Sequence, residues 1–86
     1  MQSTDPIQIE VEFFGALREY GDRIALTVAP RADVRQVKRA LAEALPPHAH
    51  PLLERSALAE EETILTSEWV LSRPTRLLAL PPVNGG

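Results

Sequence analysis

The chain has 86 residues, a formal net charge of −3 and no cysteine, and 44% of its residues are hydrophobic. This length corresponds to one small domain with a single modest core, which leaves no room for the deep catalytic cleft of a larger enzyme. The absence of cysteine excludes disulfides, thiolate metal sites and side-chain thiol catalysis, and it fits a cytoplasmic protein.

Two segments near the N-terminus alternate apolar and polar residues with the period of a β-strand. Residues 1–6 precede them and indicate a flexible polar arm without the apolar stretch of a signal peptide. The alternating apolar positions are Ile7, Ile9, Val11 and Phe13, and then Ile24, Leu26 and Val28. Because the two segments are close in sequence, we expect an antiparallel hairpin, with a short loop or single helical turn between Gly15 and Gly21.

An amphipathic helix is expected next. Asp33 is a suitable N-cap, and the proline pair at 46–47 ends the helix after about three turns. Its apolar stripe comprises Val34, Val37, Leu41, Ala44 and Leu45, whereas Arg35, Lys38, Arg39 and Glu43 lie mostly off the stripe. Residues 48–54 form a loop or a second short turn.

The C-terminal half contains short strand-like segments and one longer apolar run. Residues 57–59 and 63–66 suggest short strands around the acidic turn 60–62, and residues 69–71 are apolar and expected to pack. Residues 76–80 suggest a final strand, whose nearly continuous apolar character suits a central strand buried on more than one side. The order hairpin, helix, short strands, final strand predicts an α+β fold of the ubiquitin-like β-grasp type, a mixed sheet with one main helix packed across it. The domain would span residues 7–80.

The tail is the most informative feature of the sequence. Residues 81–86 are Pro81, Pro82, Val83, Asn84, Gly85 and Gly86. The two prolines favour an extended path, and the four residues after them reach roughly 13–14 Å, at 3.3–3.6 Å per residue. Without side chains, the two glycines would fit a narrow channel in a partner. A terminal carboxylate on Gly86 becomes reactive once it is converted to an acyl-adenylate with ATP, and a sulfur donor would then make it a thiocarboxylate. An inert frayed end is the alternative interpretation.

Two segments resemble the small subunit of molybdopterin synthase, a family of β-grasp sulfur carriers. Residues 13–19, Phe-Phe-Gly-Ala-Leu-Arg-Glu, are similar to the family's paired-Phe strand end and Leu-Arg-Glu turn, and residues 80–86 to its Pro-Pro-Val-x-Gly-Gly terminus. The resemblance covers about residues 7–86. It departs from the family at residues 73–75, where an Asp-Gly-Asp-type turn is common, and it is poor over residues 60–71.

The resemblance implies a function and partners. An E1-like adenylyltransferase would adenylate Gly86 with ATP, and a sulfurtransferase would convert the adenylate to the thiocarboxylate. The large, catalytic subunit of molybdopterin synthase would receive the tail in a heterotetramer, where sulfur passes to a cyclic pyranopterin phosphate to form the molybdopterin dithiolene. The chain would then be a co-substrate rather than an enzyme on its own.

Three further residues are candidates for the partner interface. Phe14 points away from Phe13 if the strand alternation holds, so it either meets the large subunit or joins the core under a loop. Arg18 either pairs with an acidic group of a partner or is an ordinary solvated arginine. Leu78 is either an exposed anchor or, as we expect, a core residue.

Other features predict no site. His48 and His50 lack further metal ligands nearby, and the acidic turn 60–62 is expected to be solvated, so we expect no metal. Without a Gly-rich phosphate loop we expect no bound cofactor and no ATP site on this chain. Without a basic run we expect no nucleic acid, and the apolar run at 77–83 is too short to enter a membrane as a span.

Other functions remain open at this point. The same carrier chemistry could deliver sulfur to thiazole, cysteine or tRNA. A ubiquitin-like protein modifier would instead join Gly86 to lysines of target proteins. A plain binding module with an inert tail is the fourth interpretation.

Overall fold

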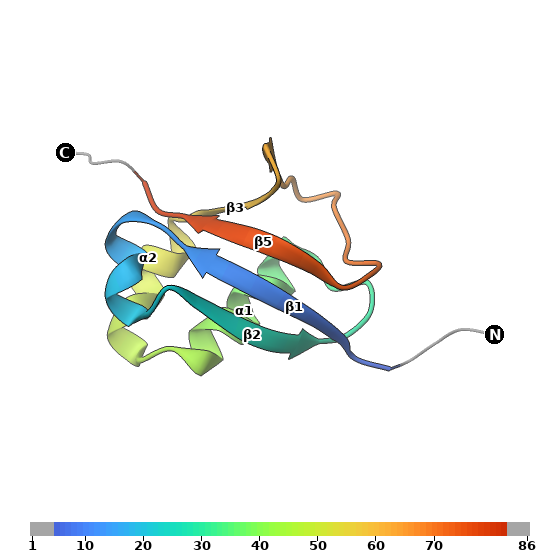
Figure 1. Ribbon diagram of the computed structural model, residues 1–86, viewed down its shortest axis with the longest axis horizontal. Coiled ribbons are helices and arrows are strands. Elements are labelled where there is room, and N and C mark those ends of the chain that lie inside the picture. The colour runs from blue at the N-terminus through green and yellow to red at the C-terminus, as the bar shows by residue number, and fades with distance from the viewer. Residues whose placement is uncertain (1–4, 83–86) are drawn as a thin grey trace.

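The structure of the chain, a computed structural model, describes residues 5–82 (Figure 1). In chain order the elements are β1 (Ile7–Phe13), the 3-10 helix η1 (Gly15–Tyr20), β2 (Arg23–Val28), α1 (Val34–Ala44), the 3-10 helix η2 (Pro47–Ala49), α2 (His50–Glu54), β3 (Ala57–Glu60), β4 (Thr63–Ile64) and β5 (Thr75–Leu80). The strands form a five-stranded sheet in the order β2-β1-β5-β3-β4. β5 runs parallel to β1, and the other neighbouring strands are antiparallel. The expected hairpin, mixed sheet and central last strand are confirmed.

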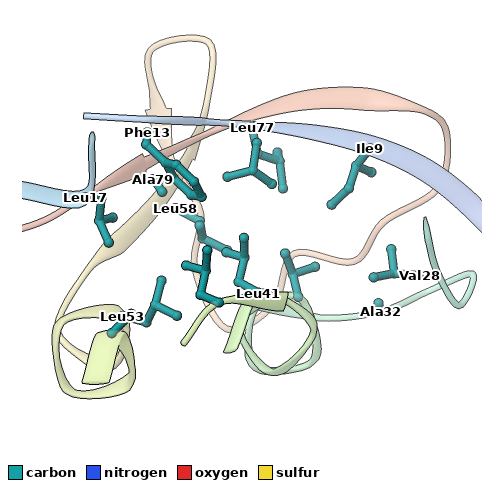
Figure 2. Packing of buried hydrophobic residues seen from close by; sticks show 14 of the residues in the cluster. Ile9, Phe13, Leu17, Val28, Ala32, Leu41, Leu53, Leu58, Leu77 and Ala79 are labelled. Carbon is teal, nitrogen blue, oxygen red and sulfur yellow. The ribbon is translucent and has the colours of Figure 1, made fainter. Parts of the chain in front are cut away.

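The core lies between one face of the sheet and the helices, as Figure 2 shows. The strands contribute the inward-facing residues of their alternating pattern, among them Ile9, Val11, Phe13, Leu58, Leu77 and Ala79. The helices and the 3-10 turns contribute Leu17, Val37, Leu41, Ala49 and Leu53. Because the helices cover one face only, the opposite face of the sheet has no layer of secondary structure over it within residues 5–82 (Figure 1).

Helix α1 begins with a complete capping box. Oδ1 of Asp33 accepts a hydrogen bond from the backbone N–H of Gln36 at 2.9 Å, and Oε1 of Gln36 accepts one from the N–H of Asp33 at 3.0 Å. These bonds satisfy N–H groups that have no partner within the helix. Of the expected apolar stripe, Val37, Leu41 and Leu45 are buried, but Ala44 is exposed, so its place in the stripe was wrong.

Strand β5 corrects one expectation. Leu77 and Ala79 are fully buried, whereas Leu78 and Leu80 are half-buried on the uncovered face of the sheet. The strand is central in the sheet, but it is buried on one side only, because the helices of residues 5–82 all lie on that side. The expectation that Leu78 belongs to the core was therefore wrong.

The segment between β4 and β5 packs less completely than its composition indicated. Leu71 is buried, and its backbone exchanges hydrogen bonds of 2.8 Å with Arg31 and Ala32. Trp69 is partly buried against the core, but Val70 is 50% exposed. The extended backbone that buries Leu71 turns its neighbour Val70 outward, so only part of the apolar triplet packs. Within residues 5–82 no helix is both long enough and apolar enough to cross a membrane.

Candidate functional site

The candidate site is the end of the sheet where the chain leaves β5. This central strand ends at Leu80, and Pro81 and Pro82 follow directly as the last residues that the structure describes. Pro81 is half-buried and Pro82 is exposed. The expected functional residues Val83, Asn84, Gly85 and Gly86 lie outside the described residues. What the structure places is the start of the tail, which follows a central strand paired on both sides, with β1 and with β3.

A contact between Gly15 and Pro81 fixes this exit. A Cβ atom added to Gly15 would lie 2.9 Å from Cγ of Pro81, which is closer than van der Waals contact. Gly15 also has φ = +54°, a left-handed conformation that side chains disfavour. Glycine is therefore favoured here for two reasons, its backbone conformation and the close approach of the proline ring. The contact links the turn after β1 to the first residue of the tail.

The uncovered face of the sheet carries an apolar patch beside this exit. We call it the outer apolar patch and define it by Phe14, Ala57, Ile64, Leu78 and Leu80, together with Ala59, which is buried beneath them. The strand register places its members side by side: Ala57 opposite Leu80, and Ala59 opposite both Leu78 and Ile64. Ile64 is 53% exposed. Contiguous apolar surface that no other element covers is typical of a protein–protein interaction site.

Phe14 joins this patch from β1. It has an extended backbone, with φ = −130° and ψ = 162°, and it directly follows the buried Phe13. Side chains alternate across an extended strand, so Phe14 emerges on the outer face, next along from the pair Phe13–Ala79 and therefore level with Leu80. It is half-buried and is not part of the core, so its interpretation as a core residue under a loop was wrong.

Arg18 lies on η1, on the surface near the tail exit. Its side chain is 62% exposed, and its guanidinium lies 3.8 Å from the carboxylate of Asp22. An exposed pair of this length contributes little to stability. Arg18 is consequently held only loosely and keeps donors available at the surface. The structure brings Phe14 and Leu78 onto one patch, with Arg18 on the neighbouring turn.

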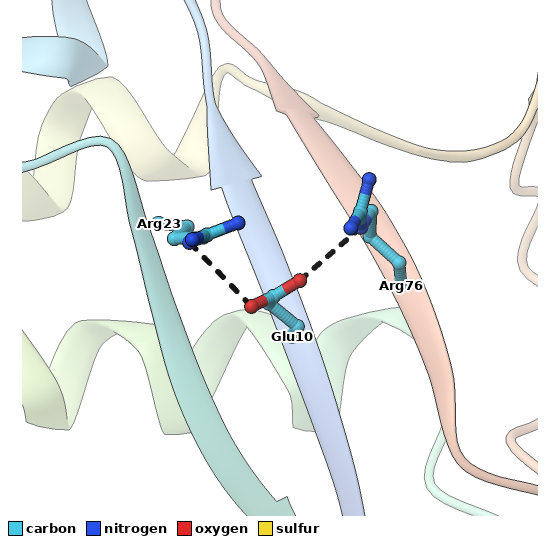
Figure 3. Close-up of polar contacts among 3 residues, drawn as sticks. All are labelled: Glu10, Arg23 and Arg76. Atoms are coloured by element: carbon cyan, nitrogen blue, oxygen red, sulfur yellow. Dashed lines mark hydrogen bonds and ion pairs between the residues drawn. The ribbon is translucent and has the colours of Figure 1, made fainter.

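An ion-paired cluster on β2, β1 and β5 lies on the same face of the sheet as the patch. Figure 3 shows the carboxylate of Glu10 on β1 between Arg23 of β2 and Arg76 of β5. Glu10 lies 3.6 Å from Nε of Arg23 and accepts a hydrogen bond of 3.2 Å from Nε of Arg76. Since all three side chains are substantially exposed, the cluster adds little stability. It gives this face a polar region in addition to the apolar patch.

The remaining candidate residues have local structural partners. The ring of His48 packs against that of Tyr20 at a tilt of 50°, with ring centroids 5.5 Å apart, and Nε2 of His50 donates to the carbonyl oxygen of Ala42 at 2.7 Å. Glu60 accepts a hydrogen bond of 2.6 Å from the hydroxyl of Thr75 and lies 3.9 Å from Arg73. Within residues 5–82 no three histidine or carboxylate side chains come together in an arrangement that could hold a metal ion.

Sequence reasoning missed two parts of the site. The alanines of β3 are small and lie opposite leucines. Nothing in the sequence around them indicates that they lie at the base of the outer apolar patch. Gly15 was recognised as a turn residue, but its contact with Pro81 joins residues far apart in the chain. In the sequence a glycine directly follows the paired phenylalanines, and a proline directly follows the last strand. These two positions together are the signal that could have suggested the contact.

Comparison with solved structures identifies the fold. The chain is similar to SAMP1 from Haloferax volcanii, with a TM-score of 0.74 and 19% identity over 92% of this chain and 99% of that one. It is also similar to the ubiquitin of Caldiarchaeum subterraneum, with a TM-score of 0.63 and 20% identity over 94% of this chain and 99% of that one. The C-terminal ubiquitin-like domain of human 2'-5'-oligoadenylate synthetase-like protein gives a TM-score of 0.63 and 14% identity, over 100% of this chain and 94% of that one.

At these identities the likeness shows the fold alone. The fold is the ubiquitin-like β-grasp, as the order of elements in the sequence predicted. No model of a known protein family matches the chain, and no curated protein sequence matches it.

Proposed function

We propose that the chain is a sulfur carrier that works through a terminal carboxylate on Gly86, and that it is the small subunit of a molybdopterin synthase. One observation carries the proposal: a central strand of a ubiquitin-like fold runs into a Pro-Pro segment that Gly15 holds in place, and the sequence continues from there to Gly-Gly. The proposal takes Gly86 as the last residue of the working protein.

The chemistry needs no side chain of the carrier. The carboxylate of Gly86 attacks the α-phosphate of ATP, which releases pyrophosphate and leaves an acyl-adenylate. A donor of sulfide-level sulfur then attacks the acyl carbon, AMP leaves, and a thiocarboxylate remains. The thiocarboxylate sulfur attacks a carbon of the cyclic pyranopterin phosphate and displaces an oxygen substituent, and water then hydrolyses the acyl–sulfur bond and restores the carboxylate. A second carrier supplies the second sulfur of the dithiolene by the same steps. A chain without cysteine suits this scheme, because it carries no thiol of its own to compete with the thiocarboxylate.

The outer apolar patch supports a role as a subunit. In the proposed complex Phe14 and Leu78 contact the large subunit, Arg18 pairs with one of its carboxylates, and residues 81–86 enter its active site. A few well-packed side chains near the centre of an interface carry most of the binding energy. The tail starts beside the patch, so docking on the patch would direct the tail toward the same partner. An E1-like enzyme would use the same tail and supply the ATP.

The test is transfer of sulfur to a defined acceptor. The thiocarboxylated protein is mixed with a cyclic pyranopterin phosphate and a large subunit of molybdopterin synthase, and the dithiolene product is measured. We expect product from the thiocarboxylate and none from the unmodified carboxylate or from a variant lacking Gly86. A thiocarboxylate that forms but yields no dithiolene would refute the assignment to molybdopterin synthesis. Isopeptide adducts on denaturing gels would instead identify a protein modifier.

A further inference from the structure

A groove lies between α1 and α2, on the side of the molecule that faces away from the sheet. It has a volume of about 450 Å³. Arg35, Lys38 and Arg39 of α1 line one wall and Glu54 of α2 lies at the other. Ala42 contributes apolar surface between them, and the buried Leu53 lies beneath. The outer apolar patch lies on the opposite face of the sheet, so a molecule in the α1–α2 groove would not obstruct it.

The groove has an excess of positive charge. Its three cationic side chains face a single carboxylate, that of Glu54, in a protein whose net charge is −3. Within residues 5–82, four arginines on the sheet side have a carboxylate within 4 Å, namely Arg18, Arg23, Arg73 and Arg76. In that same part of the chain no carboxylate lies within 4 Å of Arg35, Lys38 or Arg39.

The shape of the groove is set by contacts across it. Nζ of Lys38 donates to the backbone carbonyl of Glu54 at 3.2 Å, and His50 donates to the carbonyl of Ala42 at 2.7 Å. Both bonds tie α1 to α2, and both satisfy carbonyl oxygens near helix ends. Leu53 is 2% exposed and anchors α2 in the core. The groove is thus present without a ligand, which lowers the entropic cost of binding one.

The side chains that line the groove favour binding of an acidic protein segment. Its exposed guanidinium groups suit carboxylates, and its apolar surface suits an apolar side chain between them. An inorganic anion would find few fixed donors, since the cations that line the groove are long, flexible side chains and Nζ of Lys38 already donates to the carbonyl of Glu54. A nucleic acid would lack a stacking platform, because no phenylalanine, tyrosine or tryptophan side chain lines the groove.

We propose that the α1–α2 groove binds a segment of a partner protein that carries carboxylates flanking an apolar residue. Such a partner holds the domain from its helical side while the outer apolar patch and the tail remain free for another protein. This interaction does not involve Gly86, so it goes beyond the carrier chemistry.

The test is a titration of the ¹⁵N-labelled full-length protein followed by NMR. The probe is a synthetic ten-residue peptide of alternating glutamate and leucine, and its glutamine-for-glutamate analogue is the matched control. We expect chemical-shift changes confined to α1 and α2 with the acidic peptide, and none with the analogue. The affinity should fall as salt is raised, because exposed charges are screened over about 10 Å at 0.1 M.

Two variants with the same change in charge locate the site. Arg39→Glu should weaken binding of the acidic peptide by about tenfold or more, because it places a like charge in the groove. Arg23→Glu makes the same change on the sheet side and should leave the affinity unchanged. Equal weakening by both variants, shifts that map to the sheet face, or binding of inorganic phosphate at the same concentrations as the peptide would overturn the proposal. A protein lacking Gly86 should bind the peptide normally, which separates this result from the fate of the carrier hypothesis.

Discussion

Gly15 and Pro81 are in such close contact that a methyl group on Gly15 would lie 2.9 Å from Cγ of the proline. The turn after the first strand thereby packs against the first residue of the tail and limits its position. Because β1 and β5 are parallel neighbours, the segments that follow them leave the same end of the sheet, which brings Gly15 and Pro81 together. The direction in which the tail leaves the domain is therefore a property of the folded core.

Substitution of Gly15 by alanine tests whether the contact with Pro81 positions the tail. Gly15→Ala should destabilise the protein by about 1–3 kcal/mol through its positive φ, and it should also displace Pro81. Gly21→Ala is the matched control, because Gly21 has φ = +126° but nothing lies within 4 Å of an added Cβ. Urea unfolding gives the free energy of each variant. We expect both to lose stability, but only Gly15→Ala to slow sulfur transfer at temperatures where both are folded. Equal rates of sulfur transfer in the two variants would contradict the claim that the contact with Pro81 positions the tail.

Leu77 and Leu78 allow the two faces of β5 to be compared by adjacent substitutions. Leu77→Ala removes a fully buried side chain and should reduce the free energy of unfolding by about 2–5 kcal/mol. Leu78→Ala removes a half-buried side chain from the outer face, so about 1 kcal/mol is expected. Only Leu78→Ala should weaken binding to the large subunit, by about tenfold. Unchanged affinity in Leu78→Ala would remove Leu78 from the interface, and equal losses of stability would contradict the one-sided core.

The capping box of α1 gives a prediction about stability alone. Asp33→Ala removes the acceptor for the N–H of Gln36 and should cost about 0.5–2 kcal/mol. Asp33→Asn keeps an acceptor at the same place and should lose much less. Thermal unfolding followed by circular dichroism measures both, and identical losses would show that the cap contributes little.

Ionisation of the single tyrosine gives a prediction about the pH dependence of stability. Partial burial of the phenol, and secondarily the carboxylate of Glu19, raise the pKa of Tyr20 above its usual value of 10.0. Since the folded state favours the neutral phenol, its contribution to stability is complete below pH 10.0 and is lost as the pH rises through the folded-state pKa. Absorbance of the phenolate should titrate above pH 10.0 in the folded protein. Tyr20→Phe should remove the part of the alkaline loss of stability that comes from Tyr20. A phenolate titration whose midpoint lies at or below pH 10.0 would refute the raised pKa.

Elements with a clear period were predictable from the sequence. The alternation from Ile7 to Phe13 gives β1, and Asp33 before a 3.6-residue stripe gives α1 with its cap. The final strand was harder to interpret, because a run of consecutive apolar residues has the same pattern whether one or both faces are covered. Only the position of the helices decides that Leu78 and Leu80 face outward.

Contacts that join distant residues account for what the sequence did not reveal. The α1–α2 groove depends on Lys38 and His50, whose partners are backbone carbonyls and so leave no complementary residue type in the sequence. The contact of Gly15 with Pro81 likewise depends on the parallel register of β1 and β5. Such features follow from the tertiary fold, whereas caps and strand periods follow from neighbouring residues.

The central claim is that Gly86 carries sulfur, and whole-protein mass measured after alkylation tests it most directly. The protein is isolated from cells that make its partners and treated with iodoacetamide. Because the chain has no cysteine, a thiocarboxylate is the one thiol-like group expected. We predict a single adduct that disappears when Gly86 is deleted. Absence of any adduct, together with a carboxylate that an activating enzyme and ATP do not adenylate, would contradict the account.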